Sequence, residues 1–172
     1  MTMPSVPRAE RSPAELMYAD FSAEHASTRR MLERFADGQN DWRPHEKSRT
    51  LAQLATHVAS ILNTGTQMLE TEEVDVMTRT PQAPLSSASE LVAHFDAGAR
   101  RFDAALGTTT YEHLDAPWTM RMGSRVLVSQ PRRVLLRTLT MHHLIHHRAQ
   151  LGVYYRLLGV PVPGMYGPSA DD

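Results

Sequence analysis

The sequence contains no cysteine, which excludes disulfide bonds, thiolate metal ligands and a cysteine nucleophile. Any metal ion must therefore be held by histidine, carboxylate or carbonyl groups. Any thiol chemistry would need a substrate to bring the sulfur atom.

The chain also lacks long apolar runs and an excess of one charge. No apolar run approaches the ~20 residues that a membrane span requires, and residues 1–15 contain no apolar stretch typical of a signal peptide. Lys and Arg total 18 against 19 Asp and Glu, with Lys47 as the one lysine. A nucleic-acid-binding protein usually shows a basic excess or stripe. We therefore expect a cytoplasmic protein that binds neither membranes nor nucleic acid.

Four segments of the chain carry the apolar spacing and start signals of helices. The first opens at Ser12 and runs to about Phe35, the second opens at Thr50 and runs to about Glu70, the third spans Ser87 to Gly107, and the fourth runs from near Pro131 to Gly159. We predict an all-α, four-helix bundle in a single domain over residues 1–172, with residues 1–11 as a flexible lead-in.

Two of the connections are long enough to have a structure of their own. Residues 71–86 can form a long crossover between the second and third helices, so the sequence alone leaves the bundle topology open. Residues 108–130 alternate around Gly123, and this pattern predicts a small hairpin before the last helix.

Histidine is the unusual component, because four of the nine histidines fall between positions 142 and 147. Two of their pairings, His142/His146 and His143/His147, have the four-residue spacing that places both rings on one side of a helix. On a helical wheel of ~100° per residue, His143 and His147 lie within about 40° of the inward stripe that Leu136 begins. The other pair lies roughly 80–120° away from it. The pair His143/His147 is therefore the predicted metal-binding pair.

A third ligand would have to come from another helix. His57 lies at one edge of the apolar face of the second helix, between Leu54 and Ile61. With His143 and His147 it makes three histidines, the ligand number of a catalytic zinc site with one open position. The alternative is that these are packing histidines that find other partners, because leaving a buried polar group unpaired costs about 1–3 kcal/mol.

Gln150 and Tyr154 follow the histidines on the same stripe, one and two turns further on. Either side chain can hydrogen-bond a molecule at the open position. The alternative is that Gln150 packs sideways and Tyr154 belongs to the core. Imidazole suits zinc, nickel, copper and iron, so the ligands alone do not identify the metal.

Several stretches of the sequence resemble one known family. They are Trp42-Arg43-Pro44, the run LAQLATHVA around His57, the pattern H-x-x-H-H-R-x-Q-L from His143 to Leu151, and the C-terminal GVYYRLLGVPVPGMYGPSAD. Together they resemble the DinB family over nearly the whole chain. The resemblance implies an up-down-down-up bundle, usually a homodimer, in which His57, His143 and His147 hold a zinc, nickel or similar divalent ion.

The resemblance also implies a function. Related branches include S-transferases and isomerases that use a low-molecular-weight thiol such as bacillithiol, mycothiol or glutathione. The mycothiol-dependent isomerases resemble a set of one Glu and two His, so three histidines favour the transferase-like or uncharacterised branches. We expect a metal-dependent thiol S-transferase acting on a small-molecule substrate. The alternatives are a metal-dependent hydrolase, in which water is the nucleophile, and a non-catalytic metal-binding protein of the stress response.

Overall fold

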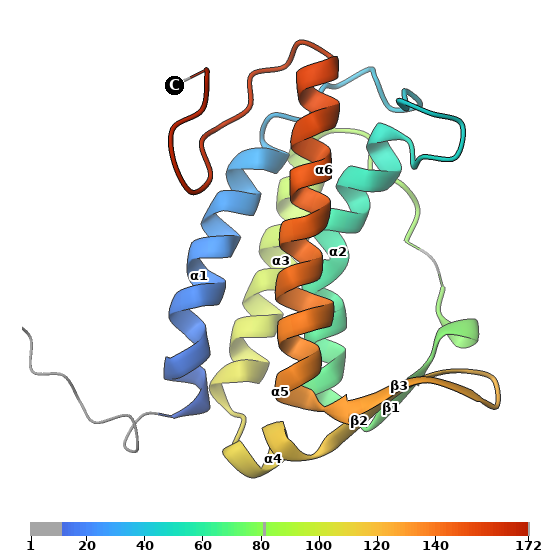
Figure 1. Cartoon of the computed structure of the whole chain (residues 1–172), viewed down its shortest axis with the longest axis vertical. Coiled ribbons are helices and arrows are strands. Elements are labelled where there is room, and N and C mark those ends of the chain that lie inside the picture. Colours follow the sequence, from blue (N-terminus) through green and yellow to red (C-terminus); the bar gives the residue numbers. More distant parts are fainter. Residues whose placement is uncertain (1–11, 81, 172) are drawn as a thin grey trace, which may run out of the picture.

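The computed structural model describes residues 12–80 and 82–171 and is mostly helical. Its long helices lie side by side (Figure 1) and are α1 (Pro13–Leu32), α2 (Leu51–Glu70), α3 (Ala88–Gly107) and α6 (His143–Leu157). Within the described ranges, no helix has the length and hydropathy needed to cross a membrane. The flexible lead-in expected for residues 1–11 lies outside the described residues, and the prediction of a single domain over residues 1–172 stays a prediction.

The starts of the first three long helices follow the predicted capping signals. Thr50 accepts a hydrogen bond from the backbone N–H of Gln53, and the Gln53 side chain accepts one from the N–H of Thr50. Ser12 forms the same reciprocal pair with Glu15, and Ser87 accepts from the N–H of Glu90. These bonds satisfy backbone donors that the first turn of a helix leaves without a partner.

The prediction of an all-α fold is incomplete, because a three-stranded sheet lies at one end of the helices. The predicted hairpin is present and consists of β2 (Pro117–Met122) and β3 (Arg125–Pro131), joined by a turn in which Gly123 has a φ of 58°. The unpredicted strand is β1 (Glu73–Asp75), which pairs in parallel with β2 and is followed by the 3₁₀ turn η2 (Val76–Thr78). The short helix α4 (Tyr111–Asp115) precedes the hairpin.

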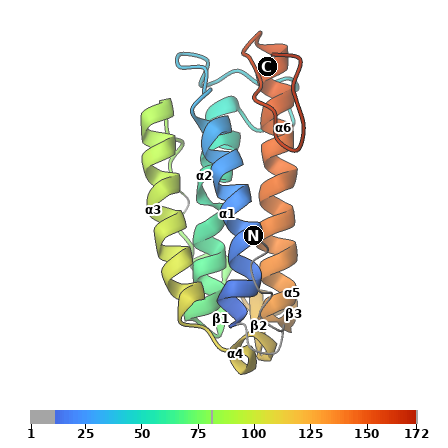
Figure 2. The ribbon, with the colours of Figure 1, turned by 90° about the vertical axis from the view of Figure 1, so that its left-hand side faces the viewer.

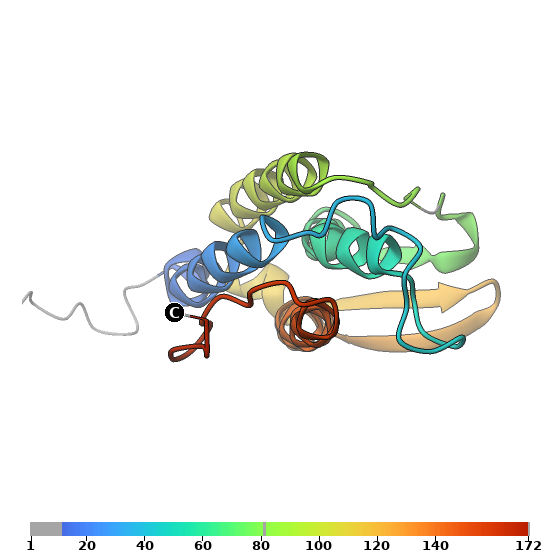
Figure 3. The ribbon, with the colours of Figure 1, turned by 90° about the horizontal axis from the view of Figure 1, so that it is seen from above.

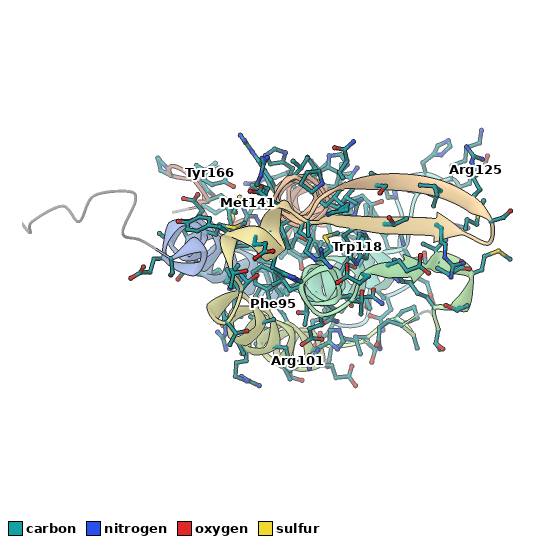
Figure 4. The ribbon with its side chains drawn as sticks, turned by 90° about the horizontal axis from the view of Figure 1, so that it is seen from below. Phe95, Arg101, Trp118, Arg125, Met141 and Tyr166 are labelled. Carbon is teal, nitrogen blue, oxygen red and sulfur yellow. The ribbon has the colours of Figure 1, made fainter. Side chains whose placement is uncertain are left out.

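Two buried side chains connect the sheet to the C-terminal end of α2 through hydrogen bonds. The indole of Trp118, labelled in the view from below in Figure 4, donates a hydrogen bond to the Thr71 hydroxyl. Arg132 is fully buried and donates to the backbone carbonyls of Met68, Thr71 and Pro117. Since Arg132 begins the last helical segment, it ties that segment to the carbonyl end of α2.

The sequence predicted one continuous α-helix for the last helical segment, but the structure divides this segment into three parts. It begins as α5 (Arg132–Leu135), continues as the π-helix η3 (Leu136–His142), and becomes α-helical again in α6. Single π turns inside α-helices occur often at functional sites. Here the π segment ends immediately before His143.

The core fills the space between the long helices. Figures 2 and 3 show the bundle from the side and from above, and α1 and α2 each pack against both α3 and α6. The apolar positions predicted to face inward on α2 and α3 are buried, as are Phe21, Leu32, Leu136 and Leu151 on the other helices. α1 ends three residues before the predicted Phe35, which is nevertheless buried through a following turn.

Candidate metal centre

Three histidine side chains from two neighbouring helices converge at one point of the bundle. His57 lies in the second turn of α2, and His143 and His147 lie in the first two turns of α6. The ring centroids are 5.0 Å apart for His57 and His143, 4.5 Å for His57 and His147, and 4.5 Å for His143 and His147. The structure thus brings together the three histidines that the sequence suggested as ligands.

Their nitrogen atoms are close enough to hold one metal ion. Each ring offers one nitrogen, and the three nitrogens lie within 4.8 Å of one another. The Nε2 atoms of His57 and His143 are only 2.9 Å apart. Two imidazole ligands at ~2.0–2.1 Å from a tetrahedral zinc ion would have their nitrogens roughly 3.4 Å apart. To hold one divalent ion, the His57 and His143 nitrogens would therefore have to separate slightly, and any pair near the 4.8 Å limit would have to close by more than an ångström.

Gln150 acts on the cluster through His147. The His147 Nδ1 atom is 2.7 Å from the Gln150 Oε1 atom, which can only accept, so Nδ1 carries the proton and Nε2 is left with its lone pair. Such a hydrogen bond from the far side of a ligating imidazole fixes both its tautomer and its orientation. Gln150 thus contacts a predicted ligand directly.

Tyr154 belongs to the packing around the cluster. Its side chain is buried, its ring stands edge-on to Trp42 at 5.4 Å, and its hydroxyl donates to the backbone carbonyl of Arg49. His142 and His146 are exposed, and the His146 ring lies beside the His147 ring at 4.8 Å. The two histidine pairs therefore separate as the helical wheel predicted.

The surroundings keep the imidazoles neutral. Burial, followed by the nearby His147, Arg49 and His143, lowers the pKa of His57 to about 3. Burial also lowers the pKa of His143 and of His147, and Arg49 contributes to both shifts. A neutral imidazole is the form that binds a metal ion. Each ring is therefore neutral and has one nitrogen with a lone pair that can bind an ion at neutral pH.

A cavity of about 670 Å³ opens beside the cluster, with His57 and His143 in its wall. This volume falls within the ~300–1,000 Å³ range of small-molecule sites. The remaining wall comes from α2, from Met120 of β2, from Leu139 of η3, from Arg49, and from Arg79, Thr80, Gln82 and Pro84. Arg49 and Arg79 were not among the residues predicted from the sequence, because no local pattern around them indicates a site.

Two further contacts hold the ligand helices in place. Gly65 of α2 faces Thr140 of η3 so closely that a Cβ atom at Gly65 would lie 2.9 Å from the Thr140 Cγ2 atom. On the other side of α6, the buried Arg148 forms an ion pair with Glu24 of α1 at 2.6 Å and a hydrogen bond with Thr28. The Tyr166 hydroxyl completes this group by bonding both Arg148 and Glu24. These contacts fix α6 between α1 and α2.

The fold and the histidine cluster together define a class, that of helical proteins with an internal three-histidine site that can hold a divalent metal ion. The DinB family model matches residues 11–172, and the chain belongs to the DinB family.

Solved structures agree with this assignment. A DinB-like protein from Bacillus cereus is 26% identical with a TM-score of 0.66, over 88% of this chain and 97% of that one. A DinB-like protein from Bacillus subtilis is 20% identical with a TM-score of 0.65, over 85% of this chain and 95% of that one. A putative DinB family member from Exiguobacterium sibiricum is 20% identical with a TM-score of 0.60, over 92% and 95% of the two chains. No curated protein matches the chain.

Proposed function

We propose that this protein is a metal-dependent enzyme of the thiol S-transferase type, with zinc or nickel bound by His57, His143 and His147. The observation that supports the proposal most directly is the convergence of three imidazoles beside a cavity of about 670 Å³. A small-molecule substrate would enter this cavity and meet the metal centre at its wall.

The number of ligands favours catalysis over a purely structural role. Structural zinc sites are closed by four protein ligands, whereas catalytic sites keep a position open. Among the described residues, the group that can hold an ion contains three histidines and no carboxylate. The cavity reaches two of these histidines, so a substrate atom can take the fourth position.

A sulfur ligand is the occupant that we propose for this open position. A divalent ion bound here would lower the pKa of a substrate thiol and hold it as a thiolate. The three imidazoles are neutral and leave the charge of the ion uncompensated, while Gln150 holds His147 in the required tautomer. With the ion held by His57, His143 and His147, such a thiolate would be able to bond to an electrophilic carbon of the second substrate, whose leaving group would depart with the electron pair of the broken bond.

Metal analysis tests the first part of the proposal. Protein purified without a polyhistidine tag and reconstituted with zinc or nickel should hold about one ion per chain. His143→Ala should lose most of that ion because two imidazoles remain, whereas His142→Ala, one position away on the exposed side, should keep it. A wild-type protein without stoichiometric metal after reconstitution would contradict the site.

A substrate screen tests the second part. Metal-loaded protein is incubated with an electrophilic substrate and with bacillithiol, glutathione or no thiol. Product that forms only with a thiol supports S-transfer, and product that forms equally well with water alone supports the hydrolase alternative. A protein that binds metal and turns over neither kind of substrate would support the non-catalytic alternative.

The proposal includes the usual architecture of the family, an up-down-down-up bundle assembled as a homodimer in the cytoplasm. The direction in which the colours run along α1, α2, α3 and α6 in Figure 1 supports this topology. Light scattering coupled to size-exclusion chromatography tests the dimer. A mass close to 19.3 kDa, the mass of one chain, would contradict it.

A further inference from the structure

In the described part of the chain, the cavity beside the histidines is lined by cationic groups and by no anionic ones. Among the described residues that line it, Arg49 and Arg79 are the charged side chains, and none is Asp or Glu. The rest of the polar lining is neutral and consists of Gln53, Thr56, Ser60, Thr64, Thr80 and Gln82. A divalent ion at the histidines would make this wall still more positive.

Arg79 is a partly buried cation for which the described residues supply no counter-ion. It lies just after η2, and its guanidinium donates a hydrogen bond to the neutral side chain of Gln67 on α2. No ion pair links it to a carboxylate in the part of the chain that the structure describes, and burial lowers its pKa. Keeping a partly desolvated charge without an opposite charge beside it is costly.

Two buried arginines, Arg132 and Arg148, differ from Arg79 because each has a carboxylate beside it. Arg132 forms an ion pair with Glu72 at 2.8 Å, and Arg148 forms one with Glu24 at 2.6 Å. Both are almost fully buried, and both have their charge compensated within the chain. Among the described residues, Arg79 in the cavity wall therefore differs from Arg132 and Arg148 in having no carboxylate beside it.

Arg49 adds a second positive charge near the histidines. It precedes the N-cap residue Thr50 of α2, and its charge is close enough to lower the pKa of His57, His143 and His147. No described carboxylate forms an ion pair with its side chain. Both arginines thus favour a negatively charged occupant of the cavity.

We propose that the cavity binds a small molecule that carries an acid group, a carboxylate or a phosphate, and that Arg79 is its main anion-binding residue, assisted by Arg49. The planar guanidinium can grip either acid with two parallel hydrogen bonds. The placement of the reactive end of the molecule at the histidines rests on the proposed function. The binding of its acid end does not.

Three small probe molecules distinguish the contribution of the acid group to binding from that of the thiol group. 3-Mercaptopropionate carries a thiol and a carboxylate, its methyl ester carries the thiol alone, and 3-hydroxypropionate carries the carboxylate alone. Their dissociation constants are measured by calorimetry on zinc-loaded and on metal-free protein. The comparison of acid with ester tests Arg79, and the comparison of thiol with hydroxyl tests the proposed function.

We expect wild-type protein in both forms to bind the acid about tenfold or more tightly than the ester, since a charge-assisted hydrogen bond is worth that much. Arg79→Gln should abolish the difference and Arg79→Lys should keep part of it. Arg125→Gln is the matched control, because Arg125 lies at the far tip of the hairpin (Figure 4) and should leave the preference intact.

Gln67→Glu provides an independent variant that leaves Arg79 in place. The new carboxylate would sit against the Arg79 guanidinium and supply the missing counter-ion within the chain. The preference for the acid should then fall as it does in Arg79→Gln. If Arg79→Gln does not fold, as judged by circular dichroism, Gln67→Glu gives the same test.

Equal binding of acid and ester by the wild type would overturn the inference, and so would an acid preference that survives both Arg79→Gln and Gln67→Glu. If the acid preference depends on Arg79 but zinc-loaded protein binds 3-hydroxypropionate as tightly as 3-mercaptopropionate, the proposed function fails and this inference stands. Competition with acetate and with inorganic phosphate then identifies the acid group. Displacement of 3-hydroxypropionate by neither anion would overturn the inference.

Discussion

At the scale of single residues, the hydrogen bond from His147 to Gln150 decides which nitrogen of His147 faces the cluster. We predict that Gln150→Ala weakens zinc binding roughly 10- to 100-fold, because the imidazole loses the partner that fixes its tautomer and orientation. The dissociation constant is measured by competition with a chromophoric chelator. Val153→Ala, an exposed change one turn further along α6, should leave the constant unchanged. Equal constants for Gln150→Ala and wild type would show that Gln150 does not orient the ligand.

His25, which lies outside the metal-binding cluster, affects how the stability of the protein depends on pH. His25 of α1 is packed among the aromatic rings of Phe21, Phe95 and Phe102, with its Nδ1 atom 3.8 Å from Asp103. Burial lowers the pKa of His25, so the folded state holds its ring neutral. The contribution of His25 to stability is therefore present above its unfolded pKa of about 6.5 and is lost as the pH falls through the folded pKa.

We predict that metal-free protein loses stability on going from pH 7 to pH 5.5, and that His25→Gln reduces this loss. The reduction can reach about 1.4 kcal/mol per pH unit, the limit for one proton. Urea unfolding at the two pH values measures it, with the exposed His142→Gln as control. Asp103→Asn should not imitate His25→Gln, because burial raises the pKa of Asp103 and its effect on stability has the opposite sign. A pH dependence unchanged in His25→Gln would disprove the prediction.

At the scale of elements, the contact between α2 and η3 controls how the histidines of the two helices meet. A Cβ atom at Gly65 would lie 2.7 Å from the Phe102 ring and 2.9 Å from Thr140. We predict that Gly65→Ala forces α2 away from these neighbours, lowers the free energy of unfolding by about 1–3 kcal/mol and weakens metal binding. Urea unfolding and chelator competition measure the two effects.

Gly152→Ala is the matched control for this change. Gly152 lies on α6, where a Cβ atom would be 3.4 Å from the flexible end of Met31, an ordinary contact. Alanine also favours the helix over glycine by up to about 1 kcal/mol. Gly152→Ala should therefore preserve stability and metal affinity. If Gly65→Ala behaves in the same way, the close approach of α2 and η3 does not position the ligands.

The helices were predictable from sequence where local chemistry determines them. Ser12, Thr50 and Ser87 each cap a helix start, and the apolar stripes on α2 and α3 match the buried residues. The π segment before His143 was not predictable, because its residues are equally compatible with an α-helix. In the structure this segment packs against α2. The strand β1 was missed for a similar reason. It has only three residues, and its partner β2 lies more than forty positions away.

At the scale of the whole molecule, the histidine cluster was predictable in outline and the cavity was not. His143 and His147 lie on one helix, so the helical period alone places them together. Placing His57 beside them required one further assumption, that the helix of His57 faces theirs. Arg49, Arg79 and Met120 come from three separate segments that meet only in the folded chain. Their spacing in the sequence carries no signal, because it depends on how the crossover and the sheet lie against α2.

Because the three histidines come from two helices, removal of the metal ion should lower the stability of the whole folded chain. An ion held by α2 and α6 together binds the folded state and not the unfolded chain, so it stabilises the protein by RT ln(1 + [L]/Kd), about 2.7 kcal/mol at a free metal concentration 100 times Kd. For a chain of 172 residues this corresponds to a rise in Tm of roughly 5–10 °C.

We predict that zinc or nickel raises the Tm of metal-free wild type by this amount and that chelator reverses it. His57→Ala and His147→Ala, which remove ligands from different helices, should each lose most of the rise, whereas His146→Ala should keep it. A rise of the same size in all three variants would mean that the ion binds elsewhere and that the two helices are not joined through it.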